Sequence, residues 1–174
     1  MDQGSTLYIG ETGDTPLGRF WLAVSDLGLV AVEWGRTQAD FEGYLSRRFK
    51  RPTSLNAQKV KEAGLQLSEY LAGSRRNFTL VIDWTVLRQF QVSVLHATCE
   101  IPYGEMCTYK EIAERIGRPS AARAVGRAEA TNPMPLVIPC HRVIGVDGKL
   151  HGYGMAQGLK TKEWLLRMEG ALIA

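Results

Sequence analysis

The chain lacks three features that often reveal a function directly: a cysteine framework, a long apolar run and a strong excess of one charge. Its three cysteines are odd in number and show no CxxC or other zinc-like spacing, so we expect neither disulfides nor a metal site. No stretch approaches the roughly 20 apolar residues of a membrane span. The N-terminus, with Asp2 and Gly4, lacks a basic-then-apolar signal pattern. Because free thiols are typical of a reducing compartment, we expect a cytoplasmic protein.

The small net charge of +3 is distributed unevenly along the 174 residues. Residues 1–85 carry ten basic and ten acidic side chains, whereas residues 86–174 carry eleven and eight, so the second half holds the whole excess. Any attraction to phosphate therefore belongs to the C-terminal part. The length and the 45% hydrophobic content predict two compact domains, residues 1–85 and 86–174.

Alternating hydrophobic runs dominate the N-terminal half. They predict strands of an antiparallel sheet, separated by turn-forming sequences, and a further strand near the end of this half. Helical spacing predicts one helix capped by Thr37 and Asp40, and a second helix that ends at Gly73. The expected strands are residues 6–9, 19–24, 29–34 and 78–84, and the second helix is residues 58–71. We interpret this α/β domain as a scaffold because it contains no catalytic constellation.

The C-terminal half is predicted to be mainly helical. After a helix over residues 90–98, Thr108 and Glu111 form a capping box at the start of another helix, and Gly117 ends it. Ser120 is the expected cap of the next helix, residues 121–128. A helix, a short turn and a second helix are typical of DNA-binding helix-turn-helix units, although an ordinary solvated helical pair has the same pattern.

The second of these helices separates two faces. Arg123 and Arg127 are four residues apart and share a face with Gly126, while Val125 and Ala128 turn to the opposite side. Small residues let a backbone approach a ligand closely. Between residues 109 and 127 five basic side chains oppose two acidic ones. This local excess indicates phosphate contacts that salt weakens.

A cysteine next to a histidine, Cys140-His141, follows a proline-rich loop that begins at Asn132. Three prolines fix the backbone of this loop and can hold one side chain rigidly. A thiol attacks only as its thiolate, so it needs a base or a positive neighbourhood. Adjacent side chains of an extended segment point to opposite faces, so we expect His141 to act through a water. Its orienting partner is Glu169 or Glu163, of which we favour Glu169 at the helix end.

These motifs together resemble the O6-alkylguanine-DNA alkyltransferases, also called methylated-DNA-protein-cysteine methyltransferases. The likeness spans residues 90–170 in family order, and residues 1–85 are more loosely similar to the family's ribonuclease-H-like N-terminal domain. It rests on Ile101 to Glu105, Thr108-Tyr109 with Ile112-Ala113, Ala121 to Gly126, Asn132-Pro133, Ile138 to Val143, and Lys162 to Leu166 with Glu169-Gly170. The implied fold is an α/β N-terminal domain with an antiparallel sheet, followed by a mainly α domain with a helix-turn-helix.

The resemblance implies a role for each site residue. Cys140 accepts the alkyl group, His141 acts as its base through water, and Glu169 orients His141. Asn132 hydrogen-bonds within the loop. Tyr109 contacts the phosphate of the flipped nucleotide and protonates the departing guanine. Arg123 is the finger that enters the base stack from the minor groove. Further implied DNA contacts are Ala122, Ala124, Gly126, Arg127 and Ser120, and the implied pocket residues are Tyr153, Gly154, Pro135, Val143 and His151.

The implied activity is direct DNA repair without a cofactor. A duplex hides the alkyl group of a paired base, so the nucleotide must flip out. The expected substrates are O6-alkylguanine and also O4-alkylthymine. The thioether product has no easy leaving route, so one molecule performs one transfer. The expected protein is a monomer that binds double-stranded DNA, has no membrane partner, and is associated with the nucleoid if the source is prokaryotic.

Three departures from the family pattern stand out. Residues 154–161 form a loop about two residues longer than usual. His151 replaces a small residue near the pocket and is expected to restrict larger alkyl groups. Glu129 replaces a neutral residue in the recognition helix and is expected to weaken phosphate contacts slightly. The zinc ligands of some relatives have no counterpart in this chain.

Three other functions compete with this interpretation. Alkyltransferase-like proteins bind alkylated DNA without repairing it, but they lack the cysteine that stands here as Cys140. A thiol hydrolase could use Cys140, His141 and Glu169, but that function leaves Arg123 and Tyr109 unexplained. A plain helix-turn-helix regulator needs no reactive thiol and usually dimerises on a palindrome.

Overall fold

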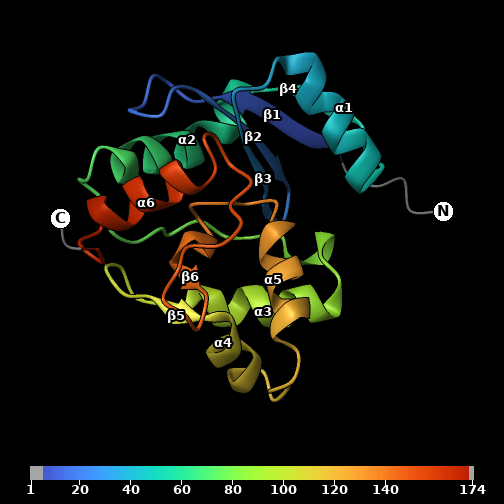
Figure 1. The fold of residues 1–174 in the computed structure, drawn as a ribbon. Coiled ribbons are helices and arrows are strands. Elements are labelled where there is room, and N and C mark those ends of the chain that lie inside the picture. The colour runs from blue at the N-terminus through green and yellow to red at the C-terminus, as the bar shows by residue number, and fades with distance from the viewer. Residues whose placement is uncertain (1–5, 173–174) are drawn as a thin grey trace. The chain divides into compact units, whose positions relative to one another are not determined.

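The computed structural model describes residues 6–172. Residues 1–5 and 173–174 lie outside the described range, which therefore does not include Asp2 and Gly4 of the N-terminus, where no signal pattern is expected. The chain folds into two compact units, Met1–Val86 and Leu87–Ala174, which the colour gradient of Figure 1 separates into blue to green and green to red. Among the described residues, no helix is long and apolar enough to cross a membrane.

The first unit is built on a four-stranded sheet in the order β3-β2-β1-β4. The three predicted strands near the N-terminus are confirmed, and each pairs with its sequence neighbour in antiparallel fashion. A fourth strand that the sequence did not predict pairs with β1 in parallel, so the sheet is mixed. This strand has three residues and is mostly exposed, so it is too short to show an alternation of hydrophobic and polar residues. The strands are β1 (Leu7–Glu11), β2 (Phe20–Ser25), β3 (Gly28–Trp34) and β4 (Thr53–Leu55).

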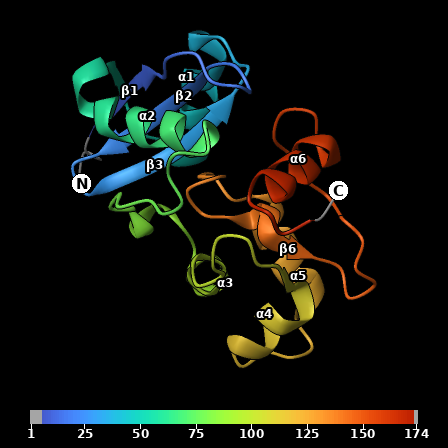
Figure 2. The ribbon, with the colours of Figure 1, turned by 90° about the vertical axis from the view of Figure 1, so that its left-hand side faces the viewer.

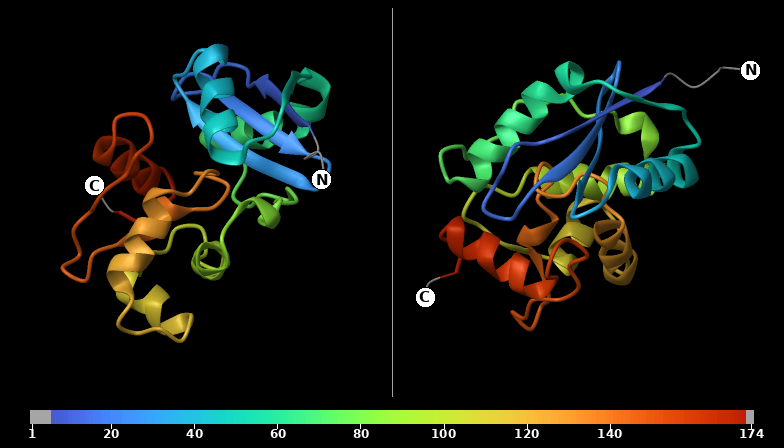
Figure 3. Two further views of the ribbon diagram at one scale, coloured as in Figure 1. Left: turned by 90° about the vertical axis from the view of Figure 1, so that its right-hand side faces the viewer. Right: turned by 90° about the horizontal axis from the view of Figure 1, so that it is seen from above.

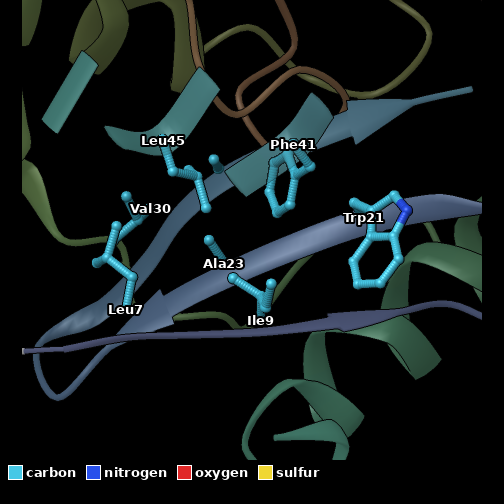
Figure 4. Close-up of a cluster of buried hydrophobic side chains, with 8 residues drawn as sticks. Leu7, Ile9, Trp21, Ala23, Val30, Phe41 and Leu45 are labelled. Atoms are coloured by element: carbon cyan, nitrogen blue, oxygen red, sulfur yellow. The ribbon is translucent and has the colours of Figure 1, made fainter. Parts of the chain in front are cut away.

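Two helices, α1 (Gln38–Phe49) and α2 (Ala57–Leu71), cover opposite faces of this sheet (Figure 3). The α1 helix begins at its predicted cap, and its buried side chains Phe41 and Leu45 pack with alternate residues of the strands, as Figure 4 shows. On the other face, α2 approaches the sheet so closely that Val60 leaves no room for a side chain at Gly10. The α2 helix therefore packs directly against the sheet at this glycine.

The predicted strand over residues 78–84 is wrong. Only Ile82 forms a bridge, to Leu29, with which Val81 and Asp83 exchange two backbone hydrogen bonds. The Asp83 carboxylate then accepts hydrogen bonds from the Ser25 hydroxyl at 2.6 Å and from the Thr85 amide at 3.1 Å. Because these contacts turn the chain into the 3-10 helix η1 (Trp84–Val86), the strand does not extend.

The second unit is mainly helical, as predicted (Figure 2). The capping box at the start of α4 is present, since Thr108 and Glu111 each accept a hydrogen bond from the other's amide. The cap of α5 was predicted wrongly: it is Ala121, which has no side-chain bond, and Ser120 lies exposed in the preceding turn. The elements are α3 (Gln89–Cys99), β5 (Cys107–Thr108), α4 (Tyr109–Arg115), α5 (Ala122–Ala130), η2 (Cys140–Arg142), β6 (Val143–Ile144) and α6 (Leu159–Met168).

Candidate functional site

A series of short backbone turns holds Cys140. The Ile138 amide donates to the Met134 carbonyl at 2.9 Å, and the Cys140 amide donates to the Ile138 carbonyl at 2.8 Å. The Asn132 side chain closes the loop, because its Nδ2 donates to the Ile138 carbonyl at 3.1 Å and its Oδ1 accepts from the Met134 amide at 2.9 Å. Leu136 adopts a left-handed φ of 73°, which a branched side chain tolerates only when its surroundings fix it. The loop is therefore rigid.

The backbone at Cys140 differs from the prediction. Cys140, His141 and Arg142 form the 3-10 helix η2, so the predicted extended segment, with Cys140 and His141 on opposite faces, is wrong. A hydrogen bond from the Arg142 amide to the Pro139 carbonyl, three residues earlier, closes this turn. All three side chains are buried.

A buried ion network includes the two residues that follow Cys140. His141 Nε2 lies 2.9 Å from Glu169 Oε1, and Arg142 donates to both carboxylate oxygens of Glu169 at 2.9 Å. A third guanidinium nitrogen of Arg142 donates to the Ile101 carbonyl at 2.7 Å. Every charged group of this network thus has a partner in place of water. Such a bidentate arginine–carboxylate contact fixes the plane of the carboxylate, and the carboxylate in turn fixes the orientation of the His141 ring.

The protonation states of the network follow from its contacts. Burial lowers the pKa of His141 although Glu169 opposes this effect, so the imidazole is neutral near neutral pH. Burial acts to raise the pKa of Glu169, but hydrogen bonds from His141 and Arg142 outweigh it and lower the pKa to about 2. A carboxylate accepts only, so His141 donates from Nε2, and the lone pair of Nδ1 is left as the proton acceptor.

Cys140 rests as a neutral thiol. Burial raises the pKa of Cys140 to about 12, with a further contribution from Glu129, while a hydrogen bond with Asn132 and the charge of Lys162 act in the opposite direction. With only 8% of its surface exposed, the sulfur is protected from bulk solvent and from adventitious oxidation. Any nucleophilic attack therefore requires removal of the proton during the reaction.

Tyr109 reaches this region through a short parallel pairing. Strand β5 pairs with β6, and Tyr109 begins α4 directly after β5, so the tyrosine is brought beside the segment that follows Cys140. Burial raises the pKa of Tyr109 to about 12, so its hydroxyl stays protonated. The hydroxyl donates to the His151 carbonyl at 3.5 Å. Lys162, which is fully buried, donates to the same carbonyl at 3.0 Å and to the Val143 carbonyl at 2.5 Å.

The two faces predicted for α5 are present. Arg123 and Arg127 are exposed, whereas Val125 and Ala128 are buried. The small residues Ala122, Ala124 and Gly126 are partly buried between these faces. The exposed side of the helix is thin and positive.

Glu129 does not lie on the exposed face, so the expected effect on phosphate contacts is wrong. Only 6% of its surface is exposed, and the Thr98 hydroxyl of α3 donates to its carboxyl oxygen Oε1. Glu129 is four residues from the buried Val125, and this spacing places both residues on the buried side of α5.

The residues predicted to line a pocket differ in their environments. Val143 is buried, Pro135 and Tyr153 are partly buried, and Gly154 is exposed. The His151 side chain is also exposed and lies 3.1 Å from Asp147 of its own loop, so it is the His151 carbonyl that contacts Tyr109 and Lys162.

The sequence did not indicate that the buried Arg142 pairs with Glu169, or that the buried Lys162 binds two backbone carbonyls. Both stand inside the motifs that carry the family resemblance. The available signal for Lys162 was its position on a hydrophobic helix face, because Leu165 and Leu166 of the same face are buried. Within residues 6–172, no group of three His, Cys, Asp or Glu side chains is arranged to hold a metal ion.

Both units match known protein families. Residues 6–84 match the ribonuclease-like domain of 6-O-methylguanine DNA methyltransferase, and residues 89–171 match the DNA-binding domain of the same protein. The chain is 43% identical over 160 residues to the methylated-DNA–protein-cysteine methyltransferase of Methanosarcina barkeri, covering 90% of this chain and 93% of that protein. It is 38% identical over 162 residues to the enzyme of the same name from Salmonella typhimurium, covering 91% and 94%.

A solved structure agrees with these sequence matches. The structure of Mycobacterium tuberculosis OGT in complex with DNA is similar with a TM-score of 0.74 and 35% identity, and the match covers 95% of this chain and 93% of that one. The predicted resemblance is thus confirmed over both units, and the chain belongs to the 6-O-methylguanine DNA methyltransferase family.

Proposed function

We propose that this protein repairs DNA by transferring an alkyl group from the O6 atom of guanine to Cys140, once per molecule. The observation that carries the proposal is the placement of Cys140 on a rigid turn whose next residue, His141, is oriented by the buried pair Glu169 and Arg142. In a member of this family, that arrangement supplies a nucleophile, a base and an orienting carboxylate.

The chemistry follows from the protonation states. The Cys140 thiol passes its proton through a water to Nδ1 of His141, the S–C bond forms and the C–O6 bond breaks. Tyr109, whose hydroxyl stays protonated, donates a proton to the departing guanine and regains one from His141. In balance, the thiol proton ends on guanine. The thioether that remains has no leaving group, so the reaction stops after one transfer and needs no cofactor. O4-alkylthymine presents a similar O-alkyl bond and is the proposed second substrate.

DNA binding is proposed for the exposed face of α5. Its small residues allow a close approach to the minor groove, Arg127 contacts phosphate, and Arg123 fills the gap left by the flipped nucleotide. Flipping costs a few kcal/mol, and the cost is smaller for a weakly paired damaged base. A single chain carries every group of the reaction, so we propose a monomer. The three free thiols fit a cytoplasmic protein.

The direct test is to incubate the protein with duplex DNA that contains one O6-methylguanine and to measure intact and peptide masses. We expect one added methyl on Cys140, restored guanine and no reaction beyond one equivalent. Turnover beyond one equivalent indicates a hydrolase instead, and unmodified protein bound to the DNA indicates a binding module. Cys140→Ala is the matched variant, which should bind the DNA and gain no methyl.

The proposed wedge has its own test. Arg123→Ala should slow repair of duplex DNA far more than reaction with the free modified base, because only the duplex requires a flipped nucleotide. Arg127→Ala is the control for lost positive charge on the same face. Equal losses with both substrates would overturn the role of Arg123.

A further inference from the structure

A second buried carboxyl group lies in the same unit as the site and takes no part in the network of Glu169. Glu129 of α5 is 6% exposed, and its Oε1 accepts a hydrogen bond from the fully buried hydroxyl of Thr98 on α3. Its other oxygen, Oε2, is also buried and has no hydrogen-bond partner among residues 6–172. A buried carboxylate with an unsatisfied oxygen is costly, so this group needs a physical explanation.

Glu129 is tied to the turn that holds Cys140, because its carbonyl accepts a hydrogen bond from the Asn132 amide at 3.1 Å and the Asn132 side chain donates to the Ile138 carbonyl, two residues before Cys140. The ionisable groups that interact electrostatically with Glu129 come from four elements of the same unit. They are Cys140 of η2, Tyr109 of α4, Cys99 of α3 and Lys162 of α6. Three of these groups become anions when they lose a proton, and a charged Glu129 disfavours that loss in each case. Lys162 favours the charged form of Glu129, but its ammonium group is already hydrogen-bonded to two backbone carbonyls.

The carboxyl group responds to this environment by retaining its proton. Burial raises the pKa of Glu129 to about 7, although the hydrogen bond from Thr98 and the charge of Lys162 both act to lower it. Near neutral pH the residue is therefore divided between its neutral and charged forms. Coupled groups of this kind titrate together, so the charge on Glu129 and the charge on the thiolate oppose one another.

We propose that Glu129 gates the ionisation of Cys140, because its neutral carboxyl permits the thiolate and its carboxylate opposes it. This inference rests on the proposed function, in which the thiolate of Cys140 is the alkyl acceptor. Glu129 is buried, so its effect on the sulfur is electrostatic. Its charge also acts on the Tyr109 hydroxyl, which takes part in methyl transfer but not in the reaction of Cys140 with iodoacetamide. The carboxylate disfavours the thiolate at high pH, where an isolated thiol is most reactive.

The gate predicts a particular pH profile for the reactivity of Cys140. Below its pKa, a thiol reacts about tenfold faster for each unit of pH, because the thiolate fraction rises by that factor. Ionisation of Glu129 should flatten this rise around pH 7. Glu129→Gln keeps the volume and an oxygen for Thr98 but cannot ionise. It should react within about twofold of the wild type at pH 5.5 and about tenfold faster at pH 8.5.

Two measurements separate the gate from the proposed function. The first is the rate at which iodoacetamide modifies Cys140, followed by peptide mass at several pH values, which needs no DNA. The second is methyl transfer from DNA that contains O6-methylguanine over the same pH values. A ratio of variant to wild-type rate that rises with pH in both supports the gate. A rising ratio with iodoacetamide and no methyl transfer in either protein contradicts the proposed function alone. A ratio that does not change with pH overturns the gate.

Two further variants make the test independent of how well Glu129→Gln folds. Thr98→Val removes the hydrogen bond that lowers the pKa of Glu129, so the flattened region should move to higher pH. Glu163→Gln removes a half-exposed carboxylate that pairs with Arg167 on α6, and its ratio to the wild type should not depend on pH. A flattened region that stays in place in Thr98→Val, measured with iodoacetamide, also overturns the gate.

Discussion

The two buried carboxyl groups of the C-terminal unit have the same exposure and opposite charge behaviour. Glu169 and Glu129 are each 6% exposed, yet the pKa of Glu169 is lowered to about 2 and that of Glu129 is raised to about 7. Glu169 accepts hydrogen bonds from His141 and from two nitrogens of Arg142, whereas Glu129 accepts one from a neutral hydroxyl. Burial acts to raise the pKa of both carboxyl groups, and only the partners of Glu169 are strong enough to outweigh it.

The two groups make stability depend on pH in opposite directions. The pKa of Glu169 is depressed below its ordinary 4.5, so its contribution is present above pH 4.5 and is lost as the pH falls toward 2. The pKa of Glu129 is raised, so its contribution is present below pH 4.5 and is lost as the pH rises through about 7. Each shift corresponds to about 3 kcal/mol of unfolding free energy.

The largest effect is expected when Glu169 loses its charge. Glu169→Gln leaves the guanidinium of Arg142 buried without a counter-charge, so we expect a loss of about 3–5 kcal/mol in unfolding free energy at pH 7. Because His141 loses its orienting carboxylate, methyl transfer should slow by about 100-fold. Urea denaturation and single-turnover kinetics measure the two effects. A stability loss below about 1 kcal/mol would show that the network is not held by its charges.

A stabilising effect is expected at the other carboxyl group. Glu129→Gln should raise the unfolding free energy by about 2–3 kcal/mol at pH 8, because the wild-type carboxylate is then buried and poorly partnered. Near pH 4.5 the wild-type carboxyl is neutral, and the two proteins should be about equal. Urea denaturation at both pH values measures the difference. An equal gain at both would mean that charge is not the cause.

An intermediate effect is expected when the geometry of the Glu169 network changes and its charge remains. Arg142→Lys keeps a cation but loses the two-pronged contact and the bond to the Ile101 carbonyl. We expect a loss of about 1–3 kcal/mol at pH 7 and a pKa of Glu169 closer to its ordinary value. Acid unfolding should therefore begin at higher pH than in the wild type. An unchanged acid midpoint would mean that charge alone sets the pKa of Glu169.

The smallest effect is expected for an exposed carboxylate on the same helix that leads to Glu169. Glu163 pairs with Arg167 at 2.8 Å, but both side chains are nearly half exposed. Glu163→Gln should change the unfolding free energy by less than about 0.5 kcal/mol, with little dependence on pH. Urea denaturation at pH 5 and pH 8 tests this. A larger change would show that this half-exposed pair stabilises the protein more than surface ion pairs usually do.

Local signals in the sequence determined much of the second unit. The capping box of Thr108 and Glu111 placed the start of α4, and the spacing of Arg123, Val125 and Arg127 separated the two faces of α5. These signals act between residues at most four positions apart, so they are readable without knowing the fold. The motif around Cys140 likewise identified the family before any geometry was known.

Only the tertiary structure decided the charge states. Glu169 meets His141 across 28 positions in the chain, and Thr98 meets Glu129 across 31. No local pattern shows whether a carboxyl group meets a guanidinium or a hydroxyl at such a distance. The sequence by itself determined that a cysteine, a histidine and a thin basic helix belong to one unit. The packing of separate helices decided which buried carboxyl group keeps its proton, because a pKa depends on the partners that folding brings within a few ångströms.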